Sequence, residues 1–261
     1  HTDASAAPSR SVRNAVPTRR PAPRLPRPRP DSRRRPAGRL SAGTRVAILA
    51  RMSDRPAPPD LAAGLLQILR DVPSFERMVY VSSSMVYGDF VRVPVAEDDP
   101  KDPKEVYGSM KLSGELVVKA FGRLFGLDCT IVRPSAVYGP TDNNRRVLGI
   151  FLENALLGKP LVVQGAANTL DFTYVDDAGQ AIVKAALHPA ASGRIYNITR
   201  GHGRTLVEAS KIIQSLEPKA RVEIISHDNR MPVRGALDIS RARTEIGYEP
   251  QVEIEEGLRR Y

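Results

Sequence analysis

The stretch VYVSSSMVYGDF, Val79 to Phe90, decides how the fold of this chain is interpreted. Residues Val79–Val81 favour a short buried strand, and Gly88–Asp89 is typical of a turn. Three consecutive serines therefore come directly after the end of a hydrophobic strand. They either cap the strand end toward solvent or line a functional site, and the surrounding sequence has to separate these alternatives.

Helical and strand-like segments alternate on both sides of this stretch. Such alternation predicts an α/β fold with a mostly parallel sheet. Ligands of such sheets bind at the carboxyl ends of the strands, which is where the serines lie. Apolar spacing predicts helices over 61–72, 104–126, 147–157, 176–187 and 205–216, and strands over 76–83, 128–134, 161–164, 195–199 and 222–226.

The composition excludes several classes of protein. The chain has 261 residues, of which 41% are hydrophobic, and no apolar run approaches the roughly 18 residues of a membrane span, so we expect a cytoplasmic protein without a membrane anchor. The single cysteine, Cys129, excludes an internal disulfide and lies in an apolar run, where we expect a buried thiol. The scattered histidines predict no metal site.

Residues 1–59 differ in composition from the rest of the chain. They hold 14 arginines, no lysine and three acidic residues, a net charge of +11, whereas residues 60–261 have a net charge of −1. The Pro- and Arg-rich segment has no apolar periodicity and cannot offset the entropy of ordering it. We predict that residues 1–43 are disordered and that residues 44–51 form at most one strand.

Several interpretations of residues 1–59 stay open. A nucleic-acid arm needs aromatic residues for base stacking, and none is present, so we expect no nucleic-acid binding. The many prolines oppose an amphipathic transit peptide. GRLSAGTR, from Gly38, lacks the Lys and the following helix of a phosphate-binding loop. Arginine without lysine, beside many Pro and Ala, is also what GC-rich DNA encodes when it is translated in a wrong frame. Two interpretations therefore stay open: residues 1–59 are a native functional arm, or they are not native protein sequence.

The sequence YGSMK places a candidate acid–base pair on the long predicted helix. Tyr107 and Lys111 are four residues apart and therefore share one helix face. A free tyrosine has a pKa of about 10, and lowering it to about 7 requires roughly 4 kcal/mol. One ammonium at about 4 Å supplies about that much, but only about 2.5 kcal/mol at 6–7 Å. Lys111 could supply part of this lowering of the Tyr107 pKa, and a positively charged nicotinamide ring beside it could supply the remainder. Ser83 would then share a hydrogen bond with the substrate oxygen.

Five stretches of the chain carry a family resemblance. They resemble the extended short-chain dehydrogenase/reductases, and more narrowly the NAD-dependent nucleotide-sugar epimerase/dehydratase family, over about residues 60–261. The resemblance implies NAD as cofactor, with NADP left open, a nucleotide-sugar substrate and a homodimer. The stretches are VYVSSSMVYGD, the run from Glu97 that contains KEVYGSMKLSGE, IVRPSAVYGP, LDFTYVDDAGQAIVKAAL and LDISRARTEIGYEPQVEIEEGLRRY.

The resemblance also assigns roles to individual positions. Catalytic roles fall on Ser83, Tyr107 and Lys111, and Lys111 also holds the nicotinamide ribose. The cofactor-binding positions are Val81, Ser82, Tyr107, Lys111, Pro134 and Ser135, and the substrate-binding positions are Ser83, Ser84, Ala136 and Arg234. Simpler interpretations stay open for some of these positions: Ser82 and Ser84 could cap the strand end, and Arg234 could lie in a solvated loop. Asp176 and Asp177 resemble a carboxylate pair, but we expect them to cap the helix that they begin.

Three departures from the family pattern bear on the reaction. Members that dehydrate sugars usually carry an acid two residues after the catalytic hydroxyl, and here that residue is Met85. Leu170 stands where many members have an arginine that grips the nucleotide diphosphate. Ala136 replaces a common asparagine. The first departure favours an oxidise-and-re-reduce cycle, as in a 4-epimerase, or a one-way reductase. The other two leave the identity of the nucleotide sugar open.

The largest departure is in the cofactor cradle. The family opens with a strand, a glycine-rich turn and a helix that receive the pyrophosphate, and no such turn precedes Asp60. We therefore expect a Rossmann-like doubly wound parallel sheet lacking its first βα units over residues 60–165, and a remainder with a small C-terminal α/β substrate region over 166–261. The favoured hypothesis is an NAD-dependent nucleotide-sugar epimerase-like enzyme. An NAD(P)-dependent ketoreductase and a catalytically silent fragment or interaction protein are the alternatives.

Overall fold

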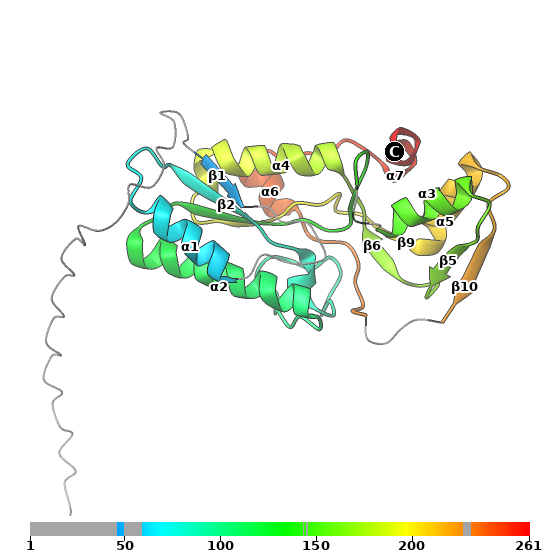
Figure 1. Ribbon diagram of the computed structural model, residues 1–261, viewed down its shortest axis with the longest axis horizontal. Coiled ribbons are helices and arrows are strands. Elements are labelled where there is room, and N and C mark those ends of the chain that lie inside the picture. Colours follow the sequence, from blue (N-terminus) through cyan, green and yellow to red (C-terminus); the bar gives the residue numbers. More distant parts are fainter. Residues whose placement is uncertain (1–45, 50–58, 143, 145, 227–230) are drawn as a thin grey trace, which may run out of the picture. The chain divides into compact units, whose positions relative to one another are not determined.

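The computed structural model describes residues 46–49, 59–142, 144, 146–226 and 231–261 (Figure 1). The chain divides into two units, residues 1–39 and 40–261, and all described residues belong to the second. The predicted disorder of residues 1–43 and the failed phosphate-loop match from Gly38 lie outside the described residues. Of the predicted strand at 44–51, the segment Val46–Leu49 is a strand.

A four-stranded parallel sheet forms the centre of the unit. Its strands lie in the order β1, β2, β3, β8, and every neighbouring pair is parallel. All five residues of β2 and of β3 are buried, as expected of strands covered on both faces. The strands are β1 Val46–Leu49, β2 Arg77–Val81, β3 Cys129–Arg133 and β8 Ile195–Asn197.

Helices cover both faces of this sheet, as Figure 1 shows. The helices α1 (Pro59–Leu69) and α2 (Val106–Phe125) pack on one face, where Met78 and Tyr80 of β2 point. The alternate residues of β2 point to the opposite face, toward α4 (Val175–Leu187) and α6 (Ser240–Ile246). The period-2 alternation of β2 thus serves two separate apolar cores.

A second group of elements surrounds another apolar core. The strands β5 and β10 pair in parallel, β4 pairs with β7 in parallel, and β6 pairs with β9 in antiparallel orientation. The elements of this group are β4 Val137–Tyr138, α3 Val147–Leu156, β5 Leu161–Gln164, β6 Thr169–Asp171, β7 Thr173–Tyr174, β9 Gly203–Thr205, α5 Leu206–Leu216, β10 Val222–Ile225 and α7 Ile254–Arg260. Two short helices lie elsewhere: η1 (Ser84–Tyr87) packs in a small cluster with Val95 and Leu237, and Ala191 of η2 (Pro189–Ala191) belongs to the core under α4 and α6.

The predicted helices and strands are found within a few residues of their expected bounds. The longest, α2, ends where Gly126 adopts a left-handed conformation with φ of 68° and donates its N–H to Gly122. Cys129 is buried in β3 as expected, and burial raises the pKa of its thiol to about 12. None of the helices in the described ranges is long and apolar enough to cross a membrane.

One prediction in this part of the chain is wrong. Asp176 and Asp177 do not cap α4, because the helix begins after Tyr174 and no side chain caps it. Asp177 is buried, and its two carboxylate oxygens accept hydrogen bonds from the backbone N–H groups of Gln251 and Val252, each at 2.9 Å. Its carboxylate therefore anchors the C-terminal segment to α4, across 74 residues of sequence.

Candidate active site

A cavity of about 600 Å³ lies beyond the carboxyl ends of β2 and β3. The loops that follow these strands contribute residues 82–85 and 134–137 to its wall, as expected for a parallel α/β sheet. Two of the ten predicted site residues, Val81 and Lys111, are not in the wall. The other eight line it: Ser82, Ser83, Ser84, Tyr107, Pro134, Ser135, Ala136 and Arg234.

The three serines have different environments at the end of β2. Ser83 caps the short helix η1, because its Oγ accepts a hydrogen bond from the backbone N–H of Met85 at 3.2 Å. The Ser82 hydroxyl donates to Glu115 at 2.6 Å. The backbone N–H of Ser84 donates to the carbonyl of Pro134 at 2.9 Å, which joins the two loops of the cavity wall. The serines therefore do not leave the strand for solvent, and all three are buried.

Lys111 lies behind the cavity wall, in contact with the strand that carries the serines. Its side chain is buried, and Nζ donates a hydrogen bond to the backbone carbonyl of Val81 at 2.8 Å. Nζ lies 5.8 Å from the ring centroid of Tyr107 and 5.6 Å from that of Tyr80. Burial lowers the pKa of Lys111 to about 8. The ammonium is therefore largely charged at neutral pH, and its positive charge favours the phenolate form of the neighbouring Tyr107.

Arg234 brings a positive charge to the cavity from a distant part of the chain. Its Nη1 lies 3.3 Å from the sulfur of Met85, and its Nε is buried without a hydrogen-bond partner among the described residues. Desolvation lowers the pKa of this guanidinium, and the nearby carboxylate of Glu105 opposes that shift. Arg234 is therefore a cavity-lining residue rather than part of a solvated loop.

Several cavity residues were not among the predicted site residues. Glu105 is the clearest, since it stands two residues before Tyr107, in the same stretch of sequence that carried the prediction. It precedes α2, and its side chain makes no capping hydrogen bond there. Met85 and Leu170, which the sequence analysis named only as departures from the family pattern, also line the wall. The other unpredicted wall residues come from loops and from the second core, and no pattern marks them: Val137, Arg146, Val147, Val162, Gln164, Asn168, Thr169, Leu206, Met231 and Pro232.

Ala136 has a backbone conformation that explains the family's asparagine at this position. Its φ is +38°, a region that alanine visits at a cost of about 1–2 kcal/mol and that asparagine tolerates better. The backbone is held there by the hydrogen bond from the N–H of Thr173 to the Ala136 carbonyl, at 3.3 Å.

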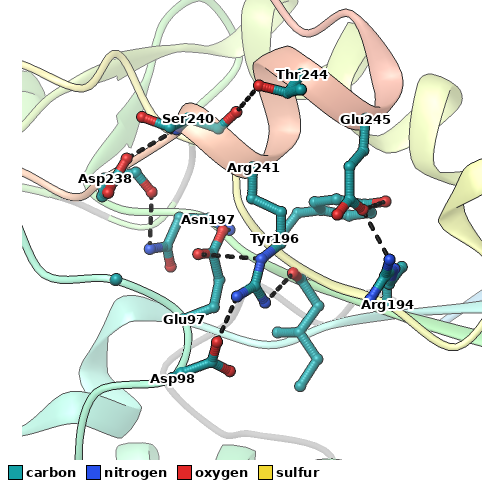
Figure 2. Close-up of polar contacts among 12 residues, drawn as sticks. Glu97, Asp98, Arg194, Tyr196, Asn197, Asp238, Ser240, Arg241, Thr244 and Glu245 are labelled. Atoms are coloured by element: carbon teal, nitrogen blue, oxygen red, sulfur yellow. Dashed lines mark hydrogen bonds and ion pairs between the residues drawn. The ribbon is translucent and has the colours of Figure 1, made fainter.

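A polar cluster ties the segment before α2 to β8 and α6, as Figure 2 shows. Glu97 accepts a hydrogen bond from the backbone N–H of Asn197 at 2.8 Å, and Arg241 of α6 pairs with Asp98. Burial raises the pKa of Glu97. Because the side chain of Asn197 also accepts a 2.8 Å hydrogen bond from Tyr87, the cluster continues into η1, which carries cavity residues.

Comparison with known proteins identifies the family. The model described as "NAD dependent epimerase/dehydratase family" matches residues 60–199, which is more than half of the chain. The chain belongs to this family. The resemblance inferred from the five motif stretches, and the Rossmann-like α/β fold expected from it, are thereby confirmed.

Curated relatives and solved structures of the family are similar to most of this chain. A UDP-glucose 4-epimerase of Mycolicibacterium smegmatis is 33% identical over 189 residues, 70% of this chain and 60% of that protein. UDP-glucuronate 4-epimerase 4 of Arabidopsis thaliana is 30% identical over 220 residues, 76% of this chain and 49% of that protein. A UDP-glucuronic acid 4-epimerase of Bacillus cereus, solved with UDP-glucuronic acid and NAD, superimposes with a TM-score of 0.73 at 27% identity, covering 77% of this chain and 64% of the other. The chain thus spans about half to two thirds of these relatives.

Proposed function

We propose that this chain is an NAD-dependent nucleotide-sugar epimerase-like protein, acting by Tyr/Lys-assisted hydride transfer at a sugar carbinol. The observation that carries the proposal is the shared cavity of Ser83 and Tyr107, with the buried ammonium of Lys111 directly behind its wall. The family and the NAD-bound solved relative support the cofactor.

The residues on the strand-end side of the cavity fit a nicotinamide group. Ser82, Pro134 and Ser135 line the same cavity as Tyr107. The Ser82 hydroxyl is already bonded to Glu115, so Ser135 and the apolar ring of Pro134 are the candidate contacts of the nicotinamide. NAD, when bound, would supply the hydride acceptor and donor. Lys111, whose Nζ is fixed by the Val81 carbonyl, would hold the ribose hydroxyls and keep a positive charge close to Tyr107.

The proton work of the reaction falls on two side chains. Tyr107 removes the proton of the sugar hydroxyl and returns it in the reverse step, and the charge of Lys111 favours its phenolate. Ser83 already accepts a hydrogen bond from the Met85 N–H, so its own hydrogen is available to the substrate oxygen. Nothing in this pair requires a further acid, and Met85 offers none. This favours epimerisation over dehydration.

Arg234 is our candidate for the diphosphate of the substrate. The side chain of Arg234 is half-buried, and its Nε is buried without a hydrogen-bond partner among the described residues. A buried donor of a cation in the cavity wall is costly to leave unpaired, and a bound anion would pair it. This arrangement supports a nucleotide sugar, whose diphosphate would meet Arg234 while its sugar meets Ser83 and Tyr107. It also compensates for Leu170, which cannot bind phosphate.

We also propose that the chain forms a homodimer through α2. Four of its large apolar side chains are exposed, Val106 by 76%, Leu116 by 57%, Leu124 by 74% and Phe125 by 46%. Exposed apolar side chains gathered on one helix suggest a protein interface. Light scattering on the eluting protein should give twice the chain mass, and Leu116→Lys should shift the protein toward monomer.

The test of the proposed function is interconversion of 4-epimers. The chain is incubated with NAD and either UDP-glucose or UDP-glucuronic acid, and the products are separated by anion-exchange chromatography. We expect 4-epimer formation that is lost in Tyr107→Phe and retained in Tyr248→Phe. The Tyr248 hydroxyl is buried, has no hydrogen-bond partner among the residues that the structure describes, and lies outside the cavity wall. Net oxidation of NAD(P)H by a keto-sugar would instead support a ketoreductase. Turnover that survives in Tyr107→Phe would refute the mechanism.

A further inference from the structure

Two consecutive contacts fasten the end of β2 to the helix that carries Tyr107. Lys111 donates to the carbonyl of Val81 at 2.8 Å, and Glu115 accepts from the hydroxyl of Ser82 at 2.6 Å. Lys111 and Glu115 are one helical turn apart, and Val81 and Ser82 are adjacent in the strand, so the contacts repeat with matching spacing. Lys111, Ser82 and Glu115 are buried.

Glu115 is held in place by a second partner. Arg133 of β3 donates through Nε to one carboxylate oxygen at 2.8 Å and through Nη2 to the other at 2.6 Å, and both side chains are fully buried. The remaining donors of Arg133 reach the Tyr87 hydroxyl at 2.8 Å and the Glu97 carbonyl at 2.9 Å. A fully paired network of this kind is rigid and specifies one arrangement of its members.

The position of this network distinguishes it from a purely structural ion pair. An apolar core would hold α2 against β2 equally well, since buried ion pairs add little net stability over well-packed apolar residues. Here the Glu115 carboxylate instead accepts a hydrogen bond from the hydroxyl of Ser82, the residue directly before Ser83. The backbone direction at Ser82 sets where the Ser83 hydroxyl points, and the same helix sets where Tyr107 and Lys111 lie.

We propose that Glu115 is a positioning residue for this site: by accepting from Ser82 and pairing with Arg133, it fixes the end of β2 against α2, so that Ser83 and Lys111 keep their places relative to Tyr107. The effect of Glu115 on catalysis rests on the proposed function. The effect of Glu115 on the position of Lys111 does not depend on that function.

Two variants remove the contact in different ways. Glu115→Gln keeps the shape of the side chain but puts an amide NH2 among three donors that point at the carboxylate. Ser82→Ala removes one hydroxyl and leaves the Glu115–Arg133 pair intact, so it remains informative if Glu115→Gln fails to fold. Thr130→Val is the matched control, because Thr130 is a fully buried residue of β3 whose hydroxyl donates to the Ala191 carbonyl at 2.6 Å, outside the cavity wall.

The decisive readout is the titration of Lys111, which needs no cofactor. Competitive acetylation across a pH series, quantified by peptide mass spectrometry, gives the labelling midpoint of Lys111 with the exposed Lys219 as internal standard. Burial places the pKa of Lys111 at about 8 in the wild type. Releasing the end of β2 admits water to Nζ, so we expect the midpoint to rise by about one pH unit or more in Glu115→Gln and Ser82→Ala. Thr130→Val should lose comparable thermal stability with the midpoint unchanged.

The outcomes separate the inference from the proposed function. A midpoint that stays at the wild-type value in Ser82→Ala, or one that shifts equally in Thr130→Val, overturns the positioning role of Glu115. If the wild type shows no epimerisation while the midpoint shifts as expected, the proposed function fails and the fixed place of Lys111 stands. If the wild type is active, Ser82→Ala should lower kcat about tenfold or more with little change in KM, as misplacement of reacting groups does. An increase in KM with kcat unchanged would overturn the proposed effect of Glu115 on catalysis.

Discussion

Breaking the buried ion pair between Arg133 and Glu115 should be one of the most destabilising single changes in the sheet. Arg133→Met removes a guanidinium that makes four hydrogen bonds and leaves a carboxylate, fully buried, with only the Ser82 hydroxyl among its contacts described above. Removing one partner of a buried pair typically costs about 3–5 kcal/mol. At about 2–4 °C per kcal/mol for a domain of this size, Tm should fall by about 6–20 °C.

Replacing both partners should cost less than replacing one. In Arg133→Met combined with Glu115→Met no uncompensated charge remains, and apolar replacements of buried ion pairs are often neutral. The Tyr87 hydroxyl keeps its bond to Asn197 at 2.8 Å. We therefore expect the double variant to be more stable than Arg133→Met alone, a strongly non-additive result.

Urea unfolding followed by far-UV circular dichroism at pH 7 measures these differences, with linear extrapolation to water. Arg260→Met is the matched control, since Arg260 makes an exposed pair with Glu256 at 2.9 Å and its loss should leave the free energy of unfolding close to the wild-type value. Arg133→Met within about 1 kcal/mol of the wild type, or a double variant that loses the sum of the two single losses, would refute the reasoning.

Three further changes test other parts of the structure. Gly114→Ala should destabilise the protein, because its Cβ would lie 2.1 Å from the Tyr80 hydroxyl, whereas Gly179→Ala, with nothing within 4 Å on an exposed helix position, should stabilise it by up to about 1 kcal/mol in thermal melts. Burial raises the pKa of Asp171 to about 7, so between about pH 4 and 7 the carboxyl group is ionised in the unfolded chain but protonated in the folded protein. The free energy of unfolding of the wild type, relative to that of Asp171→Asn, should therefore fall as the pH rises from about 4 to 7 and stay constant above. If urea unfolding shows the same difference at every pH, this prediction is wrong. Cys129, with its pKa raised to about 12, should resist alkylation at pH 8 until the protein unfolds, and rapid labelling of the folded protein would show that the thiol is accessible.

The parts of the fold that depend on local periodicity could be predicted from the sequence. The buried strand β2 and the apolar spacing of α2 appear where they were expected, because each is set by neighbouring residues on one element. The i, i+4 spacing of Tyr107 and Lys111 likewise survives into the structure, with Lys111 Nζ 5.8 Å from the Tyr107 ring. Local spacing was enough to find the core of the candidate site.

The parts that depend on distant partners could not be predicted. Glu115 stands at i+4 from Lys111, but its role requires Ser82 and Arg133, which come from two different strands. Asp177 was expected to cap a helix because a carboxylate in the first turn usually does, and its partners 74 and 75 residues away outweighed that preference. Arg234 meets Met85 across 149 residues, through a loop without any periodic pattern.

Calorimetric titration with NAD tests whether the chain has a usable nicotinamide site formed around Lys111. We expect binding in the micromolar range, weakened about tenfold or more in Lys111→Ala, because this variant loses the ammonium that is anchored on the Val81 carbonyl. Lys119→Ala, two turns further along the same helix and outside the cavity wall, should bind as the wild type does. Absence of heat up to about 1 mM NAD, from protein shown to unfold cooperatively, would show that this chain has no such site.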